Sequence, residues 1–224
     1  MTKTITVDGP AGSGKSTVSR LLSEKLNFLY LDTGAMYRAV ALAAIKRVIN
    51  LDDGGRLGDL CRSLDLIFQT NEDPPRLFLD KQDISMAIRR PEIDLSASTV
   101  SAVKEVRKAM TILQRNMAKG ANVVAEGRDM GTVVFPRAEH KFFLTASANE
   151  RAKRRYKERL ARGESVSMGS VEMELRKRDL QDKTRELAPL KPAKDAIIID
   201  STGLTIEQVL EEMLGYLKKE NSLL

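Results

Sequence analysis

The chain has 224 residues with 42% hydrophobic content, which is enough for one sizeable α/β core with additional segments. The single cysteine, Cys61, excludes an internal disulfide and a cysteine-rich zinc site, and the only histidine, His140, has no second histidine for a metal cluster. The net charge of +6 could indicate nucleic acid, but 4% aromatic content without Trp offers few stacking platforms, so small polyanions are the expected ligands.

The first predicted strand, over residues 4–8, leads directly into a glycine-rich loop with the spacing G-x-x-x-x-G-K-S. In such a loop successive backbone N–H groups converge on a polyphosphate, Lys15 adds a cation toward the β and γ phosphates, and the Ser16 hydroxyl can ligate Mg²⁺. Apolar residues at helical spacing follow, and they predict a helix whose N-terminus points at the phosphates. The loop residues are Gly9, Pro10, Ala11, Gly12, Ser13, Gly14, Lys15, Ser16 and Thr17.

A second strand, over residues 28–32, precedes a helix over about 35–48, with Asp32 and Thr33 in the position of an N-cap. Residues 52–75 change character, because glycines and prolines interrupt short apolar segments there, and this predicts a small β-rich insertion. The interrupting residues are Gly54, Gly55, Gly58, Pro74 and Pro75. Helical periodicity resumes over residues 93–119.

The second half of the chain continues the alternation of strands and helices. Apolar runs at residues 122–126 and 141–145 predict central strands, and residues 149–161 and 170–186 predict two charged helices joined by a glycine-containing link. A strand over 196–200 and a helix capped by Thr205 and Gln208 close the chain. This order predicts a three-layer α/β/α fold with a parallel sheet. In such folds ligands bind at the carboxyl ends of the strands, and the phosphate loop, residues 32–38 and residues 126–129 are all expected there.

The helix over residues 149–161 carries clustered arginines. At about 100° per residue, four of them fall within a narrow arc, with Arg159 at its edge. Only Glu158 lies among them, so they repel one another unless an anion such as a nucleoside triphosphate lies across them. The alternative interpretation is a solvated basic face. The arginines of the arc are Arg151, Arg154, Arg155 and Arg162.

In the next predicted helix an apolar stripe that starts at Val171 and Leu175 continues through Arg178, Asp182 and Arg185. Salt-bridged helix faces commonly have this pattern, but its place on the otherwise buried face favours the lining of a cleft.

A phosphate loop, clustered arginines, an insertion and a glycine-linked pair of charged helices together indicate a phosphoryl-transfer enzyme, in which positioning and cations carry the catalysis. Water must be excluded, so we expect the two charged helices to close as a lid. An alternative from another class is a nucleotide-switched P-loop ATPase that binds nucleic acid through its basic helices. A nucleoside monophosphate kinase that accepts a broader range of pyrimidine or purine nucleotides is a third possibility.

Along nearly its whole length the chain resembles the bacterial-type cytidylate kinases, a family of nucleoside monophosphate kinases. The resemblance rests on DTGAMYR at residues 32–38, GRDMGTVVFP at 127–136 and the segment 178–189. It implies ATP-dependent and Mg²⁺-dependent phosphorylation of CMP and dCMP to CDP and dCDP. It also implies a P-loop core of residues 1–48, 105–150 and 188–224, a nucleoside-monophosphate-binding domain of 49–104 with the insertion, and a lid with flanking helices of 151–187.

The resemblance also implies roles for individual residues. ATP would be held by residues 9–17 and Arg154, and the catalytic residues would be Lys15, Arg128, Arg151 and Arg155. The substrate-binding residues would be Thr33, Arg38, Ser98, Arg107, Asp129, Arg178, Asp182 and Arg185. Where some members of the family carry Ser, this chain has Thr33, which keeps the hydroxyl.

Base selectivity follows from the hydrogen-bonding groups of the three residues that the resemblance places on cytosine. Asp129 can accept from the N4 amine of cytosine, and Arg107 and Ser98 can donate to N3 and O2. Uracil would turn a carbonyl toward the carboxylate, so CMP is expected well above UMP. We expect a cytoplasmic protein without membrane partners, because no apolar run approaches 18 residues and the N-terminus has no signal-peptide pattern. We expect no nucleic-acid partner, because the aromatic content is low and no nucleic-acid-binding module is recognisable. We expect a monomer, because two flanking moving domains leave little surface free.

Overall fold

The computed structural model describes residues 2–69 and 75–219. The chain forms two compact units: the residues up to Tyr30 together with those from Ala121 onward make the first, and Leu31–Gly120 make the second. The division into core, monophosphate-binding domain and lid stays a prediction.

The first unit is built on a five-stranded sheet of order β2-β6-β1-β7-β8. Its strands are β1 (Thr4–Asp8), β2 (Leu29–Asp32), β6 (Val123–Gly127), β7 (His140–Thr145) and β8 (Ile197–Asp200). β1 pairs in parallel with both β6 and β7, and β7 pairs in parallel with β8. After Tyr30 the chain of β2 passes into the second unit. The predicted α/β fold with a parallel sheet is therefore confirmed.

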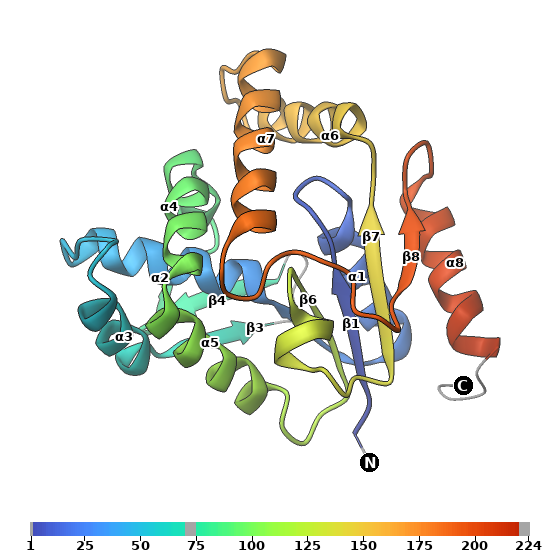
Figure 1. Cartoon of the computed structure of the whole chain (residues 1–224), viewed down its shortest axis with the longest axis horizontal. Coiled ribbons are helices and arrows are strands. Elements are labelled where there is room, and N and C mark those ends of the chain that lie inside the picture. Colours follow the sequence, from blue (N-terminus) through green and yellow to red (C-terminus); the bar gives the residue numbers. More distant parts are fainter. Residues whose placement is uncertain (1, 70–74, 220–224) are drawn as a thin grey trace. The chain divides into compact units, whose positions relative to one another are not determined.

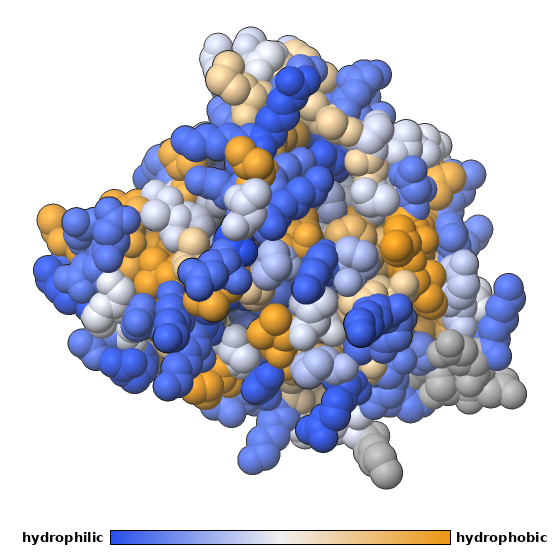
Figure 2. Space-filling view, in the orientation of Figure 1, coloured by the Kyte–Doolittle hydropathy of each residue, from blue (hydrophilic) through white to orange (hydrophobic). Residues whose placement is uncertain are grey.

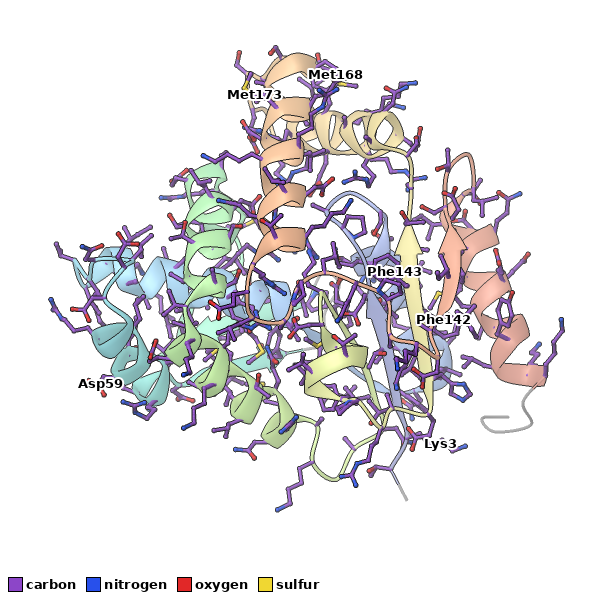
Figure 3. All side chains as sticks on the ribbon, viewed as in Figure 1. Lys3, Asp59, Phe142, Phe143, Met168 and Met173 are labelled. Atoms are coloured by element: carbon purple, nitrogen blue, oxygen red, sulfur yellow. The ribbon has the colours of Figure 1, made fainter. Side chains whose placement is uncertain are left out.

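Helices α1 (Lys15–Leu26) and α8 (Ile206–Lys219) supply one face of the hydrophobic core of this sheet (Figure 1). Phe142 is 1% exposed within that core, whereas its neighbour Phe143 points to the opposite face of β7 (Figure 3). The predicted cap of α8 is confirmed, since the Thr205 N–H donates to Gln208 Oε1 at 2.9 Å and the Gln208 N–H donates to Thr205 Oγ1 at 3.3 Å.

On the face of β1 opposite to that core, Asp8 lies against a short π-helix, η2 (Met130–Val134). Asp8 accepts the backbone N–H groups of Met130 and Gly131, both at 2.8 Å. π-Helical turns are rare and are concentrated at functional sites. Here the turn follows directly after the Glu126–Asp129 sequence at the end of β6.

The two charged helices are α6 (Ala148–Ala161) and α7 (Met168–Thr184), close to the predicted ranges. They run crosswise in Figure 1, and Met168 and Met173 mark the start of α7 in Figure 3. Ala152 of α6 packs with Val171 and Leu175 of α7 and with Ala11 of the phosphate loop. The apolar stripe of these helices therefore attaches them to the loop.

The second unit contains α2 (Thr33–Lys46), α3 (Gly54–Ser63), η1 (Ala87–Arg89), α4 (Pro91–Ala102) and α5 (Lys104–Met117). Strands β3 (Leu66–Gln69), β4 (Arg76–Leu79) and β5 (Gln82–Asp83) form a separate antiparallel sheet. Asp32 caps α2 as predicted, because its Oδ1 accepts the Ala35 N–H at 2.8 Å. The helical periodicity over 93–119 belongs to two helices that separate at Val103.

The prediction of a β-rich insertion was wrong for residues 54–63, which form α3. Asp53 caps this helix by accepting the Arg56 N–H at 3.0 Å. Gly58 allows α3 to pack closely against α5, since a Cβ on Gly58 would lie 2.9 Å from Glu105 Cβ. The strand prediction holds for β3 and β4, and Pro74 lies outside the described residues.

Within the described residues, no helix is both long and apolar enough to cross a membrane. Hydrophilic residues dominate the face shown in Figure 2, and an apolar area lies over β8, where Ile198 is 60% exposed.

Candidate active site

The loop between β1 and α1 is shaped by close contacts that only glycine permits. A Cβ on Gly9 would lie 2.1 Å from the Leu144 carbonyl oxygen, and a Cβ on Gly12 would lie 2.9 Å from the Arg151 carbonyl oxygen. Gly12 also has a φ of 77°, in the left-handed region that disfavours other residues. The loop therefore lies tightly between β7 and α6, and its buried Lys15 ammonium donates to the Pro10 carbonyl at 3.4 Å.

Ser13 of the loop carries a buried hydroxyl for which no hydrogen-bond partner is found within residues 2–69 and 75–219. The residue is 0% exposed. Because a buried polar group without a partner costs free energy, such a group in a native fold calls for a ligand or an ordered water. A phosphate oxygen, which accepts hydrogen bonds, is chemically suited to this hydroxyl.

Ser16, at the start of α1, is linked to the carboxyl end of β6. Its Oγ donates to Glu126 Oε2 at 2.9 Å, and the Tyr30 hydroxyl donates to the other carboxylate oxygen, Oε1, at 2.5 Å. Glu126 is 2% exposed and Tyr30 is 7% exposed. A serine hydroxyl that donates its only proton to a carboxylate keeps its lone pairs for a cation, so these residues suit Mg²⁺ held with a triphosphate.

Two arginines of α6 attach this helix to the phosphate loop. Arg151 Nη1 donates to the Ala11 carbonyl at 3.1 Å, and its two Nη atoms form a bidentate pair with Asp179 of α7 at 3.1 and 2.7 Å. Arg154 donates to the Ser13 carbonyl at 3.3 Å and to Ser201 Oγ at 2.9 Å. Both guanidinium groups thus lie at the loop that the sequence predicts to hold a triphosphate.

The other arginines of the arc are paired with carboxylates. Arg155 and Arg162 both pair with Glu158, and Arg159 pairs with Glu164 and Glu174, each at 2.7 Å. The prediction that only Glu158 offsets this charge was therefore wrong. The sequence arc considered α6 alone, whereas α7 and the link between the helices supply further acidic groups. A solvated basic face is excluded for Arg151 and Arg159, which are 6% and 7% exposed.

A second pair of ionic contacts joins the end of β6 to the end of α7. Arg128 Nε donates to Asp182 Oδ2 at 2.7 Å, and Arg185 Nη2 lies 3.5 Å from Asp129 Oδ1. Burial opposes the charge of Arg128, but the carboxylates of Asp182, Glu126 and Asp179 together outweigh it and raise the pKa of the guanidinium. Burial likewise favours neutral Asp182, yet Arg128, Arg178 and Arg185 together hold the pKa of that carboxyl below its ordinary value.

Arg178, between these residues on α7, is one of the positive charges that lower the pKa of Asp182. The predicted stripe of Arg178, Asp182 and Arg185 is thereby brought together with Arg128 and Asp129 in the first unit. Burial also raises the pKa of Asp8 to about 6, although the N–H groups of Gly131 and Met130 oppose this shift.

The remaining predicted site residues belong to the second unit. Arg38 of α2 lies 3.4 Å from Asp32 Oδ2 and 3.6 Å from Asp94 Oδ1. Arg107 of α5 is 6% exposed, donates to the Ser101 carbonyl at 3.0 Å and lies 5.7 Å from the centroid of the Tyr37 ring. Arg38 and Arg107 are therefore each held in place by contacts with other residues of the second unit.

Ser98 of α4 is linked to Arg107 through Ser101, whose Oγ donates to the Ser98 carbonyl at 2.8 Å. Thr33 opens α2 and is 2% exposed. Sequence reasoning missed Tyr30, Asp179 and Ser201, because a tyrosine in an apolar strand, an acid on a charged helix and a serine after a strand carry no recognisable pattern.

A phosphate loop between the first strand of a parallel sheet and a helix, with arginine-bearing helices packed on that loop, defines a P-loop phosphotransferase. Within this class, the cytidylate kinase family model matches residues 5–219, and the chain belongs to the cytidylate kinase family.

Curated relatives agree with this assignment. A protein of Citrifermentans bemidjiense described as cytidylate kinase is 50% identical over 215 residues, covering 96% of this chain and 92% of the relative. One of Vibrio cholerae serotype O1, described in the same way, is 45% identical over 219 residues, covering 98% of this chain and 97% of the relative. The crystal structure of an uncharacterized protein from Eubacterium ventriosum shares the fold, with a TM-score of 0.53 at 12% identity and coverage of 96% and 98%.

Proposed function

We propose that the chain transfers the γ-phosphoryl group of ATP to CMP, and also to dCMP, as a small-molecule enzyme that acts as a monomer in the cytoplasm. The observation that carries this proposal is the family match over residues 5–219, which includes an intact phosphate loop. In the reaction an oxygen of the CMP phosphate bonds to the γ phosphorus of ATP, and the bond from that phosphorus to the β–γ bridging oxygen breaks. The products are ADP and CDP, with no other reactant.

The donor would be held by residues 9–17 and Arg154. The Lys15 ammonium neutralises charge on the β and γ phosphates, and the partnerless Ser13 hydroxyl donates to a phosphate oxygen. Ser16 would ligate Mg²⁺, which when bound offsets the phosphate charge and orients the triphosphate. The fit is supported by Glu126, which accepts the hydrogen bond of the Ser16 hydroxyl and leaves the lone pairs of that hydroxyl available.

Selection of cytosine would depend on Asp129, Arg107 and Ser98. A carboxylate accepts from the N4 amine of cytosine, whereas the O4 carbonyl of uracil would leave it without a donor. Arg185 Nη2 lies 3.5 Å from Asp129 Oδ1, which places a positive charge beside this carboxylate. Sites that recognise a hydrogen-bonding group discriminate strongly against an analogue without it, so CMP is expected far above UMP.

Arginines would bind both the acceptor CMP and the phosphoryl group that is transferred to it. Arg38 is proposed for the CMP phosphate, and Asp182 for the ribose, together with Arg178 and Arg185. On the side of the transferred group, Arg128, Arg151 and Arg155 would stabilise the charge on the equatorial oxygens. Thr33, buried at the N-terminus of α2, would contribute its hydroxyl to the acceptor.

The test is ADP production from Mg-ATP with CMP, dCMP, UMP, AMP or GMP, with a control that contains no acceptor. Activity confined to CMP and dCMP is the expected result. Equal rates with CMP and UMP would refute the selection of cytosine by Asp129, Arg107 and Ser98, but would still agree with a nucleoside monophosphate kinase. ATP hydrolysis that does not depend on an acceptor would refute the proposed reaction.

A further inference from the structure

Tyr30 is a polar residue of the sheet to which the proposed mechanism gives no task. It lies on β2, and its hydroxyl donates to Glu126 Oε1 at 2.5 Å and lies 3.4 Å from the Ser16 carbonyl oxygen. The second oxygen of the same carboxylate accepts from Ser16 Oγ at 2.9 Å. Three elements, β2, β6 and α1, therefore meet at one buried carboxylate.

The geometry links the hydrogen bond that Glu126 accepts from Tyr30 to the one that it accepts from Ser16. The terminal torsion of a glutamate is broad, so a carboxylate with one hydrogen bond can rotate away from its partner at little cost. With one oxygen fixed by Tyr30, the other is fixed toward Ser16. Glu126 and Tyr30 are both buried, so the hydrogen bond between them does not compete with bulk water, whereas Ser16 is exposed at the start of α1.

This arrangement sets the direction in which the Ser16 hydroxyl points its proton. A serine hydroxyl has one proton and two lone pairs, and a cation is ligated by a lone pair. A fixed acceptor at 2.9 Å holds the proton toward Glu126, so the hydroxyl does not have to reorient when a cation arrives. A loosely held carboxylate would lose this preorganisation.

We propose that Tyr30 is a positioning residue of the metal–nucleotide site, which acts through Glu126 to hold the Ser16 hydroxyl ready for a divalent cation. This inference rests on the proposed function, in which Ser16 ligates Mg²⁺. A purely structural role would need only the buried aromatic ring and not its hydroxyl. The proposal therefore concerns the hydroxyl alone, and Tyr30→Phe removes that group with little change of shape.

The measurement is the affinity of Mn²⁺ for the complex of the protein with β,γ-methylene-ATP, obtained from the electron paramagnetic resonance signal of free Mn²⁺. Tyr30→Phe is expected to weaken this affinity about threefold to tenfold, the factor for one intramolecular hydrogen bond. Nucleotide affinity in EDTA should stay within about twofold, because no metal is present there. Tyr216→Phe, in which a tyrosine of α8 loses its hydroxyl, is the matched control and should leave Mn²⁺ affinity unchanged.

A double-mutant cycle with Ser16→Ala separates positioning from a general structural effect. If Tyr30 acts through Ser16, Tyr30→Phe adds no further loss of Mn²⁺ affinity to Ser16→Ala. The same loss in both backgrounds, or an equal loss of nucleotide affinity in EDTA, would overturn the proposal. Should Tyr30→Phe not fold, Glu126→Gln tests the same link, and Mn²⁺ affinity equal to that of the wild type would overturn it as well.

The outcome is independent of the test of the reaction. Mn²⁺ binding that depends on Tyr30 supports the positioning role even if the acceptor panel refutes CMP as substrate. Conversely, a CMP kinase in which Tyr30→Phe binds Mn²⁺ like the wild type keeps the proposed function and loses this inference.

Discussion

Asp8→Asn should remove a pH dependence of stability that the structure assigns to one buried carboxyl. Burial raises the pKa of Asp8 to about 6 in the folded chain, from 3.8 for the exposed group. The folded state therefore binds this proton more tightly than the unfolded state, and stability falls as the pH rises from about 4 through 6. The full difference corresponds to about 3 kcal/mol, of which about 1.3 kcal/mol is lost between pH 5 and pH 7.

The assay is urea unfolding of the wild type and of Asp8→Asn at several values between pH 5 and pH 7. The free energy of unfolding of the wild type minus that of Asp8→Asn should fall by about 1.3 kcal/mol between pH 5 and pH 7, because the amide does not titrate. Glu211→Gln, on the exposed face of α8, reports what the same chemical change does without burial. A difference that stays constant with pH would refute the reasoning, and would mean that the N–H groups of Gly131 and Met130 fully offset burial.

Three further outcomes are expected. Lys15→Ala should lower kcat/KM for CMP about 100- to 1000-fold, and a rate within tenfold of the wild type would contradict its role at the phosphates. Gly12→Ala places a Cβ 2.9 Å from a carbonyl oxygen of α6, so KM for ATP should rise in initial-rate measurements while KM for CMP stays the same. Asp182→Asn should lower the free energy of urea unfolding by about 3 kcal/mol, since it leaves a buried guanidinium without its counter-charge. Asp59→Asn breaks an exposed pair instead and should cost less than about 1 kcal/mol.

The sequence was sufficient for the parallel sheet because its strands are short segments rich in apolar and β-branched residues, and they alternate with helical patterns. It misjudged residues 54–63, where Gly54, Gly55 and Gly58 suggested a broken chain. Gly54 and Gly58 fit against the Glu105 side chain instead, and no local pattern reveals that α5 will come so close. Tertiary packing overrode local propensity there.

The phosphate loop could be predicted in full, since its chemistry is contained in nine successive residues. The partners of its groups could not, because they come from distant elements. Tyr30 and Glu126 are 96 residues apart in the chain, and their hydrogen bond depends on the sheet order that places β2 next to β6. The prediction of the charge balance of α6 was wrong for the same reason, because Asp179, which pairs with Arg151, belongs to another helix.

That charge balance also determines how Arg151 can act on a nucleotide. A guanidinium has five N–H groups, and within the described residues Arg151 directs Nε to Ala146, both protons of Nη1 to Ala11 and Asp179, and one of Nη2 to Asp179. One N–H of Nη2 is left for a phosphate oxygen. We infer that Arg151 can join the triphosphate without leaving Asp179, which avoids the large cost of an uncompensated buried charge. The bond from Arg151 to Ala11, together with that from Arg154 to Ser13, keeps the start of α6 on the loop.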